Sequence, residues 1–302
     1  MTQVAIELDR LTKFYGPHRG VEDLELVVEP GRAFGFLGPN GAGKSTTMRV
    51  LLDFHRPTSG HAAVLGLDSR RDSVEIRRRT GYLSGDIALY ERLTALDQLT
   101  WLGRLRGGVA RARIVELADR LGLDLSRRIG ELSKGNRQKV GLVQAFMHEP
   151  ELLILDEPTS GLDPLVQHTF QEMVRETADD GRTVFLSSHI IDEVDRACDE
   201  VAIIREGRMV AVETIEALRA RSVRQVRITF DHDVELSEFR ELAGVHDVSG
   251  TARSVVIRTT GDIDAIVKLA ARHHVLDLVS ERADLESVFL AYYGGDDTGA
   301  PA

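Results

Sequence analysis

Short apolar runs and amphipathic segments alternate along the first two thirds of the chain. Continuous apolar runs, typical of strands covered on both faces, lie at residues 33–37, 152–155, 183–187 and 201–204. Segments with helical spacing or helix-start signals occupy residues 46–52, 73–79, 164–180 and 190–198. Strands that alternate with helices predict a parallel sheet with helices on both faces, so the fold class is α/β.

Shorter patterns complete this part of the chain. Alternating residues at 3–8 and 21–28 predict strands with one exposed face, and short strands are expected at 62–66 and 80–83. Residues 209–212 are expected to pair with 201–204 through a hairpin turn at Glu206-Gly207. Residues 11–16 are predicted to be a loop, and 57–60 a turn.

From about residue 88 to 150 the spacing becomes helical and predicts no strand. Leucines at 93, 96, 99, 102 and 105 lie three apart, which predicts one helix face. Val115, Leu117, Ala118 and Leu121 predict a second helix. This stretch is interpreted as a helical insertion in the α/β core.

The charged helix at residues 213–221 marks the expected boundary between residues 1–218 and a small α+β domain at 219–302. Strands are predicted at 224–230, 245–248, 254–258 and 275–280, and helices at 236–242, 263–272 and 285–293. The order is β-α-β-β-α-β with a final helix. Residues 294–302 are expected to be disordered.

Composition narrows the function classes. The chain has 302 residues, a net charge of −10 and one cysteine, Cys198. An acidic chain is a poor candidate for tracking nucleic-acid phosphates, so no nucleic-acid partner is expected. A single cysteine excludes an intrachain disulfide and suits a reducing cytoplasm, where Cys198 is expected to pack a helix. The N-terminus lacks the features of a signal peptide, and no apolar run is long enough to span a membrane.

The strongest chemical signal is the stretch Gly38-Pro39-Asn40-Gly41-Ala42-Gly43-Lys44-Ser45, followed by Thr46. It lies between a predicted strand and a predicted helix, which is the context of a phosphate-binding loop. Backbone N–H groups would turn around a polyphosphate at the helix N-terminus. Lys44 would reach the β- and γ-phosphates, and Ser45 would hold Mg²⁺. The alternative is a chance glycine-rich turn.

A second signal is the apolar run that ends in Asp156-Glu157. In phosphate-loop ATPases an acidic residue at such a strand end is a second Mg²⁺ ligand, the role predicted for Asp156. Glu157 would polarise the attacking water. Alone, the pair could equally be a solvated strand end.

A third signal is Leu132-Ser133-Lys134-Gly135-Asn136, which precedes a helical pattern. It is a second glycine-containing turn at a helix N-terminus and therefore a second candidate anion site. Taken singly, it could be only an N-cap formed by Ser133.

Taken in order, these motifs resemble the ATP-binding subunits of ABC transporters, over residues 3 to about 218. Residues 132–136 resemble the family signature, Ser160 to Asp163 the D-loop, and His189 the switch histidine. Tyr15 lies where the family stacks an aromatic ring on adenine. The resemblance implies ATP and Mg²⁺ as cofactors, Glu157, His189 and Lys44 as catalytic residues, and Ser133, Gly135 and Asp163 among the nucleotide-binding ones.

The resemblance also implies partners. Two subunits would pair head to tail, with ATP between the phosphate loop of one and the signature turn of the other. His189 would contact the γ-phosphate and hold Glu157 and water in place, whereas the bland alternative is a histidine capping a strand end. Because no membrane span lies in this chain, the resemblance implies a separate permease that this subunit would power for export. The subunit would then be cytoplasmic and held on the inner face of the cell membrane through the permease. The rivals are a soluble ABC-type ATPase and a non-hydrolytic nucleotide-binding module.

Two features fit the resemblance less closely. Where the family usually has a glutamine that approaches Mg²⁺, this chain has Ser84-Gly85-Asp86. Water could fill that place, Asp86 could substitute, or coupling could run through the loop backbone. The C-terminal domain resembles the accessory domain of drug-export subunits, on residues 226–230 and element order, and either a regulatory or a purely structural role fits it.

Overall fold

The computed structural model describes residues 4–221 and 223–281. The chain divides into two compact units, residues 1–213 and 214–302, and each is described by itself. Among the described residues, no helix is both long and apolar enough to cross a membrane. The predicted helix at 285–293 and the tail at 294–302 lie outside the described residues.

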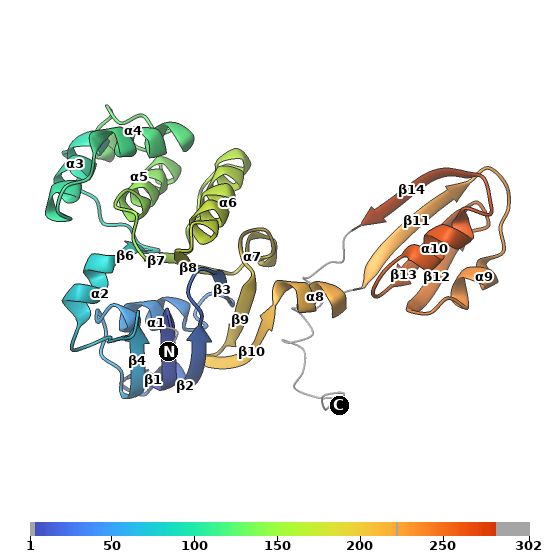
Figure 1. Cartoon of the computed structure of the whole chain (residues 1–302), viewed down its shortest axis with the longest axis horizontal. Helices are drawn as coiled ribbons and strands as arrows, with labels where there is room; N and C mark the ends of the chain where they lie inside the picture. The colour runs from blue at the N-terminus through green and yellow to red at the C-terminus, as the bar shows by residue number, and fades with distance from the viewer. Residues whose placement is uncertain (1–3, 222, 282–302) are drawn as a thin grey trace. The chain divides into compact units, whose positions relative to one another are not determined.

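Strands and helices alternate through the first unit (Figure 1). Its strands are β1 (Ile6–Tyr15), β2 (His18–Val28), β3 (Ala33–Leu37), β4 (Ser59–Val64), β5 (Leu67–Asp68), β6 (Thr80–Leu83), β7 (Leu152–Asp156), β8 (Thr183–Ser188), β9 (Glu200–Arg205) and β10 (Arg208–Thr214). Its helices are α1 (Lys44–Leu51), α2 (Ser73–Arg79), α3 (Ala95–Leu105), α4 (Arg111–Arg120), the 3₁₀ turn η1 (Ile129–Glu131), α5 (Lys134–Phe146), α6 (Pro164–Asp179) and α7 (Ile191–Ala197).

A six-stranded sheet in the order β10-β9-β3-β8-β7-β6 forms the centre of this unit. The pairs β6–β7, β7–β8, β8–β3 and β3–β9 are all parallel. Every residue of β3 and β7 is buried, as their continuous apolar sequences predict for strands covered on both faces. The predicted α/β class is confirmed.

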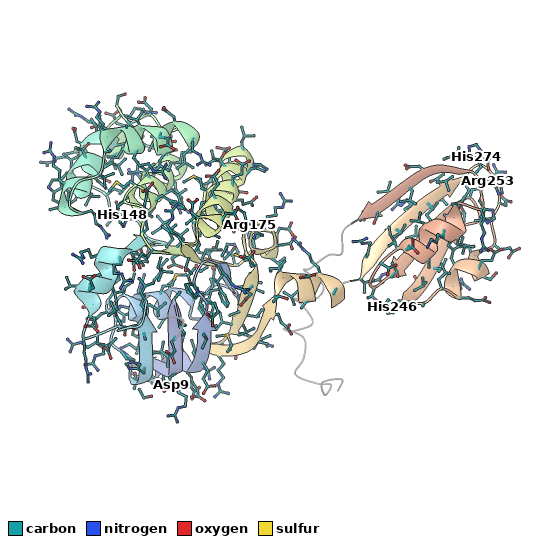
Figure 2. The ribbon with its side chains drawn as sticks, in the orientation of Figure 1. Asp9, His148, Arg175, His246, Arg253 and His274 are labelled. Carbon is teal, nitrogen blue, oxygen red and sulfur yellow. The ribbon has the colours of Figure 1, made fainter. Side chains whose placement is uncertain are left out.

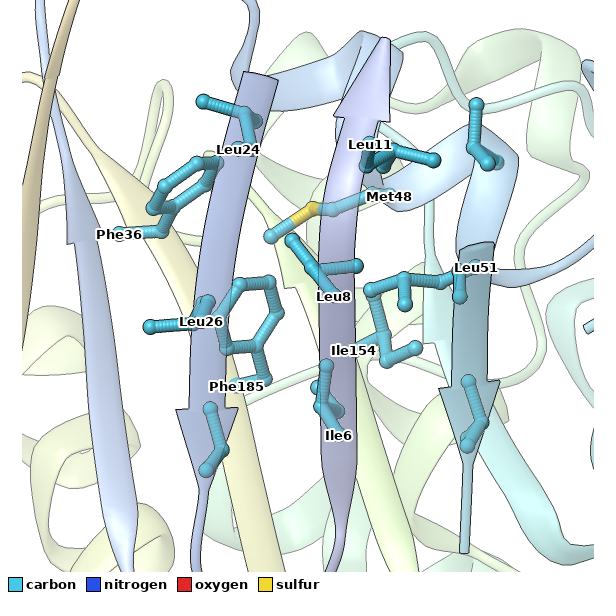
Figure 3. Close-up of a cluster of buried hydrophobic side chains, with 14 of the residues drawn as sticks. Ile6, Leu8, Leu11, Leu24, Leu26, Phe36, Met48, Leu51, Ile154 and Phe185 are labelled. Carbon is cyan, nitrogen blue, oxygen red and sulfur yellow. The ribbon is translucent and has the colours of Figure 1, made fainter. Parts of the chain in front are cut away.

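A second sheet, in the order β2-β1-β4-β5, packs over α1 and the first sheet. Leu8 and Leu26 from this sheet meet Met48 of α1 and the rings of Phe36 and Phe185 in one buried cluster (Figure 3). Ala42, in the loop that joins β3 to α1, belongs to the same cluster. Burying apolar groups there contributes roughly 25 cal/mol for each Å² removed from water.

The helical insertion comprises α3, α4, η1 and α5, which group together in Figure 1. Within residues 88–150 the structure has no strand, as predicted, and only an isolated bridge pairs Thr94 with Arg128. The predicted leucine face is wrong in part. Leu99 is buried, whereas Leu105 is exposed and Leu93 precedes α3. In a helix of 3.6 residues per turn, leucines spaced three residues apart are each rotated by about 60° from the one before. Five such leucines therefore cannot share one face.

The predicted loop at residues 11–16 is also wrong, because β1 continues to Tyr15 and pairs with β2 as far as Tyr15↔His18. Arg10 adopts a left-handed backbone (φ 45°), and the register with β2 shifts after Leu8. This bulge interrupts the alternation that would have marked the strand in sequence. The expected turn at 57–60 is shorter than predicted, since β4 begins at Ser59.

Polar contacts fix the outer helices. Arg175 of α6, labelled in Figure 2, donates to the carboxylate of Asp199 and to the carbonyls of Arg196 and Cys198, at the end of α7.

Cys198 is buried, and its burial raises the pKa of its thiol, which fits the packing role predicted for it. At the end of α5, burial lowers the pKa of His148 to about 4, so this side chain is neutral at pH 7.

The second unit has the predicted β-α-β-β-α-β order. Helix α8 (Ile215–Arg221) leads into β11 (Arg224–Phe230), α9 (Leu236–Arg240), β12 (Val245–Thr251), β13 (Ser254–Thr259), α10 (Asp264–Ala270) and β14 (Val275–Glu281). Its antiparallel sheet, in the order β12-β13-β11-β14, is that of a ferredoxin-like unit. Its hydrophobic core, built on Phe230, Phe239 and Ile257, shares no residue with the core shown in Figure 3.

Because the cores are separate, a chain that ends near Ala220 should fold and bind ATP with unchanged affinity. Circular dichroism and equilibrium titration with ATP would measure this. The matched control is Phe239→Ala in the full chain, which should lower the stability of the second unit by about 3–5 kcal/mol and leave ATP affinity unchanged. An unfolded shortened chain would show that the units depend on each other.

Candidate active site

Three segments meet at the carboxyl edge of the six-stranded sheet. The adjacent parallel strands β3, β8 and β7 end at Leu37, Ser188 and Asp156. Their pairing aligns Leu37 with Ser188 and Asp156 with Ser187. The predicted phosphate loop, His189 and the Asp156-Glu157 pair therefore emerge side by side, which is where ligands bind in open α/β sheets.

The glycines of the phosphate loop are required by the backbone. Gly41 and Gly43 have φ angles of 81° and 109°, in the left-handed region. A Cβ on Gly43 would lie 2.5 Å from Val21 Cγ1, and one on Gly38 would lie 2.4 Å from the Ile204 carbonyl oxygen. No side chain caps the N-terminus of α1, so its first N–H groups point toward the loop without a side-chain acceptor. The loop has the geometry of an anion site.

Lys44 is buried, with 5% of its surface exposed, and its ammonium group is held by oxygen atoms. Its Nζ donates to the carbonyls of Gly38 (2.5 Å) and Pro39 (3.2 Å) and lies 3.1 Å from Glu157 Oε1. A buried ammonium ion is costly unless paired, and these oxygens compensate its charge. The same group can turn to a phosphate when one enters.

Asp156 is buried at the end of β7, and its Oδ1 accepts a 2.7 Å hydrogen bond from Ser187 Oγ. The Ser187 hydroxyl in turn accepts from the backbone N–H of Glu157, at 3.0 Å. Ser187 thus ties the two acidic residues to the neighbouring strand. Sequence reasoning missed this role, since a serine inside an apolar run gives no local signal of its partner.

Glu157 and His189 are in direct contact. The Nδ1 of His189 lies 2.7 Å from Glu157 Oε2, and the carboxylate can only accept, so Nδ1 carries the proton of this hydrogen bond. Glu157 has a left-handed backbone, with φ 49°, a conformation that costs about 1–3 kcal/mol for such a residue and is concentrated at active sites. Gln138 of α5 supports it by donating to the carbonyls of Glu157 and Pro158. The pair predicted from sequence is brought together.

A cleft of about 300 Å³ opens over the phosphate loop. It is lined by Tyr15, Arg19, Gly20, residues 39–46 and Glu157. Tyr15 borders it and is anchored by a 2.6 Å hydrogen bond between its hydroxyl and His55 Nδ1. Burial, aided by the charges of Arg49 and Lys13, lowers the pKa of His55, so its neutral ring can accept this bond. Arg19 and Gly20 were not predicted, since their strand carries no motif.

The second glycine turn does not line this cleft. Ser133 caps α5 by accepting a hydrogen bond from Asn136 N, and Asp163 caps α6 by accepting from Leu165 N and Val166 N. A Cβ on Gly135 would lie 2.5 Å from the Gly161 carbonyl oxygen, so these two turns touch within one chain. Within one copy, therefore, Ser133, Gly135 and Asp163 lie on a surface separate from the cleft.

The Ser84-Gly85-Asp86 segment lies beside Asp156. A Cβ on Gly85 would be 3.4 Å from Asp156 Oδ2, the oxygen that Ser187 does not bond. Gly85 therefore passes the acidic strand end with backbone alone, and Asp86 is exposed. Because residue 85 is a glycine, no side chain from this position packs on Asp156 Oδ2.

Comparison with known proteins supports the geometry. Residues 21–160 match the family described as ABC transporter. The bacitracin transport ATP-binding protein BcrA of Bacillus licheniformis is 32% identical over 303 residues, which are 97% of this chain and 99% of the relative. This chain belongs to the ABC transporter family. It is an ATP-binding subunit with the P-loop fold and ATPase activity of that family.

One further relative and one solved structure are similar to this ABC subunit. The daunorubicin/doxorubicin resistance ATP-binding protein DrrA of Streptomyces peucetius is 39% identical over 221 residues, covering 72% of this chain and 67% of the relative. The dimeric structure of MJ0796, a bacterial ABC transporter cassette, superimposes with a TM-score of 0.63 at 23% identity, covering 70% of this chain and 98% of that one. The second similarity shows the fold.

Two substitutions should separate binding from chemistry. Glu157→Gln keeps the size of the side chain but removes the carboxylate that is predicted to act as the base, so it should lower ATP turnover at least about 10²-fold and retain ATP binding. Lys44→Ala removes the ammonium group that is predicted to bind phosphate and should weaken ATP binding itself. Steady-state phosphate release and equilibrium nucleotide titration measure the two effects. Turnover of Glu157→Gln within a few-fold of the wild type would remove Glu157 from the base role.

Proposed function

We propose that this subunit hydrolyses Mg²⁺-ATP at sites shared by two copies and so drives export through a separate membrane permease. The observation that carries the proposal is the placement of the two anion-binding turns. The phosphate loop and Glu157 line one cleft, whereas Ser133 and Gly135 lie on another surface of the same chain. A second copy placed head to tail would complete each cleft.

Within each site, Lys44 would exchange its carbonyl and carboxylate partners for the β- and γ-phosphates. Glu157 would then accept a proton from the attacking water. Its Oε1 is buried and receives no aligned hydrogen bond among the described residues, so its lone pairs can serve a water molecule. His189, held by Oε2, would orient Glu157 and reach the γ-phosphate.

The donor set at the strand end fits Mg²⁺. Hydroxyl and carboxylate oxygens are its preferred protein ligands, and Ser45 and Asp156 supply one of each. Ser187 donates its hydrogen bond to Asp156 Oδ1, so Oδ2, which faces Gly85, could bind the metal ion. When bound, Mg²⁺ would neutralise charge on the β- and γ-phosphate oxygens.

The surface around the second turn suits contact with another copy. Leu165, at the start of α6 beside Asp163, is 82% exposed. Lys134 and Ser160 join the two turns through a 3.2 Å hydrogen bond, so they would meet the second copy as one surface. Covering an exposed leucine on ATP binding would add to the stability of the dimer.

A docking surface for the permease is proposed on the helical insertion. A groove of about 440 Å³ is lined by Tyr90, Leu93, Asp97 and Trp101. Tyr90 and Trp101 are 57% and 43% exposed and meet edge to face at 5.5 Å. The alternative, that the 84–94 loop packs onto the insertion, holds for Ile87, which lies against Gly141 of α5. Tyr90 also packs edge to face on Trp101 of α3, but both rings keep a large exposed surface, which suits contact with a partner.

The cargo class follows the relatives. BcrA is named for bacitracin transport and DrrA for daunorubicin/doxorubicin resistance. We propose a drug-like cargo that the permease selects, with this subunit in the cytoplasm on the inner face of the membrane. The alignment with BcrA covers 97% of this chain and so includes most of the second unit, which would be the accessory domain of this class of exporter.

Dimer formation gives the first test. Purified Glu157→Gln protein should shift from monomer to dimer when ATP is added, because binding persists while hydrolysis stops. Ser133→Arg in that background should abolish the shift and keep monomeric ATP binding. Ser126→Arg, an exposed serine of the same insertion, is the matched control and should dimerise. Light scattering reports the mass, and ATP bound without any mass change would contradict the shared site.

Permease docking gives the second test. Tyr90→Asp places a charge in the apolar groove, so it should weaken co-purification with the permease at least about tenfold, the loss expected at an interface hot spot. Basal ATPase activity of the free subunit should stay within twofold, a range typical of surface changes. Val27→Asp, which places the same charge at an exposed valine of β2, is the control and should leave co-purification with the permease unchanged. An intact complex together with an unfolded free subunit would assign Tyr90 to the core.

A further inference from the structure

Glu193 is a buried acidic residue in the first turn of α7, and the mechanism above does not use it. Only 9% of its surface is exposed. Within residues 4–221 and 223–281, the structure places no lysine, arginine or histidine at ion-pair distance from it. A buried carboxylate without a cation is costly unless hydrogen bonds satisfy it, so its partners are informative.

Two hydroxyl groups satisfy the carboxylate, one on each oxygen. Thr159 Oγ1 donates to Oε1 at 2.5 Å, and Ser188 Oγ donates to Oε2 at 2.6 Å. These are the lengths of charge-assisted O–H···O⁻ hydrogen bonds. Thr159 and Ser188 are themselves buried, so solvent does not compete for either bond. Glu193 therefore links two segments that are distant in sequence.

The first segment leads to His189. Ser188 is the last residue of β8, and its carbonyl accepts a 3.1 Å hydrogen bond from Gly38 N at the start of the phosphate loop. Its hydroxyl also accepts from Ile190 N, at 3.0 Å. The residues on both sides of His189 are thus fixed through the single hydroxyl that Glu193 orients.

The second segment leads to the surface proposed to meet another copy. Thr159 opens the turn that contains Ser160, Gly161 and Leu162, and its carbonyl accepts from Leu162 N at 3.0 Å. Ser160 N donates to the Glu157 carbonyl at 3.2 Å. Any displacement of residues 160–163 by a second copy would therefore act on Thr159, and through it on Glu193.

We propose that Glu193 is a positioning residue that joins the 159–163 turn to the strand end carrying His189. The link makes these two segments move as one body. Closure of a second copy on residues 160–163 then places His189 against the γ-phosphate, so hydrolysis waits for the dimer. This inference rests on the proposed function, because it uses the roles of His189 and of the shared site.

The main test is Glu193→Ala, which removes both hydrogen bonds. Its kcat should fall roughly ten- to a hundredfold, the range for losing a hydrogen bond to a charged group. Equilibrium ATP binding to the monomer should stay within about twofold, because the hydrogen bond from Gly38 N to the Ser188 carbonyl does not involve Glu193. Glu193→Gln keeps one acceptor and the packing, and should recover most of the lost kcat. Asp192→Ala, at the exposed neighbour in the same turn, should match the wild type.

Two smaller changes cut one end of the link each and keep the test decisive if Glu193→Ala does not fold. Thr159→Val, an isosteric change, should weaken ATP-driven dimerisation in the Glu157→Gln background. Ser188→Ala should lower kcat with ATP affinity retained. Because all three act through one link, Thr159→Val combined with Glu193→Ala should lower kcat no further than Glu193→Ala alone.

The positioning role is wrong if Thr159→Val and Ser188→Ala both keep wild-type kcat and dimerisation. It is also wrong if the double variant loses the sum of the single effects. Glu157→Gln, measured in the same series, separates this failure from a failure of the proposed function. If Glu157→Gln keeps its turnover, the shared-site mechanism itself is wrong.

Discussion

The pairing of β7, β8 and β3 is the constraint on which the site depends. Parallel strands in register bring their carboxyl ends to one edge, where Leu37 lies beside Ser188 and Asp156 beside Ser187. The register is fixed because all three strands are buried on both faces and are covered by helices and by the second sheet. A slip of one residue would move every side chain to the opposite face of the sheet and away from its packing partners. Packing thus places groups that no local sequence signal relates.

Electrostatics at this edge explains both how the phosphate loop is stabilised and how it can accept a phosphate. Lys44 and Glu157 both line the cleft, and their charges compensate each other at a distance of 3.1 Å between Nζ and Oε1. The two groups are at ion-pair distance but form no aligned hydrogen bond at Glu157 Oε1. Little hydrogen-bond energy is therefore lost when a phosphate replaces the carboxylate as the partner of Lys44. The stronger hydrogen bonds, from Ser187 to Asp156 and between His189 and Glu157, hold the acidic groups in place. The loop is therefore preorganised, and only the lysine must change partners.

Sequence predicted the features that depend on local chemistry. Glycines at 38, 41 and 43, an apolar strand ending in Asp156 and the N-cap at Asp163 each carry their structural reason within a few residues. The missed features depend on contacts between distant segments. A bulge at Arg10 breaks the alternation of β1, so the sequence pattern predicted a loop where the strand continues. The pairing with β2 is what shows the strand there. The link from Thr159 to Glu193 spans 34 residues, so no spacing rule could indicate it.

The central claim is that a complete ATP site is assembled from two copies, and a cross-link between them tests it most directly. Asn40→Cys and Ser133→Cys would be made separately in the Glu157→Gln background, since both positions are exposed and the native Cys198 is buried. The two proteins are mixed with a short bifunctional thiol reagent. The account predicts a covalent heterodimer that forms only when both proteins and ATP are present. An ATP-bound dimer that gives no such product would contradict it.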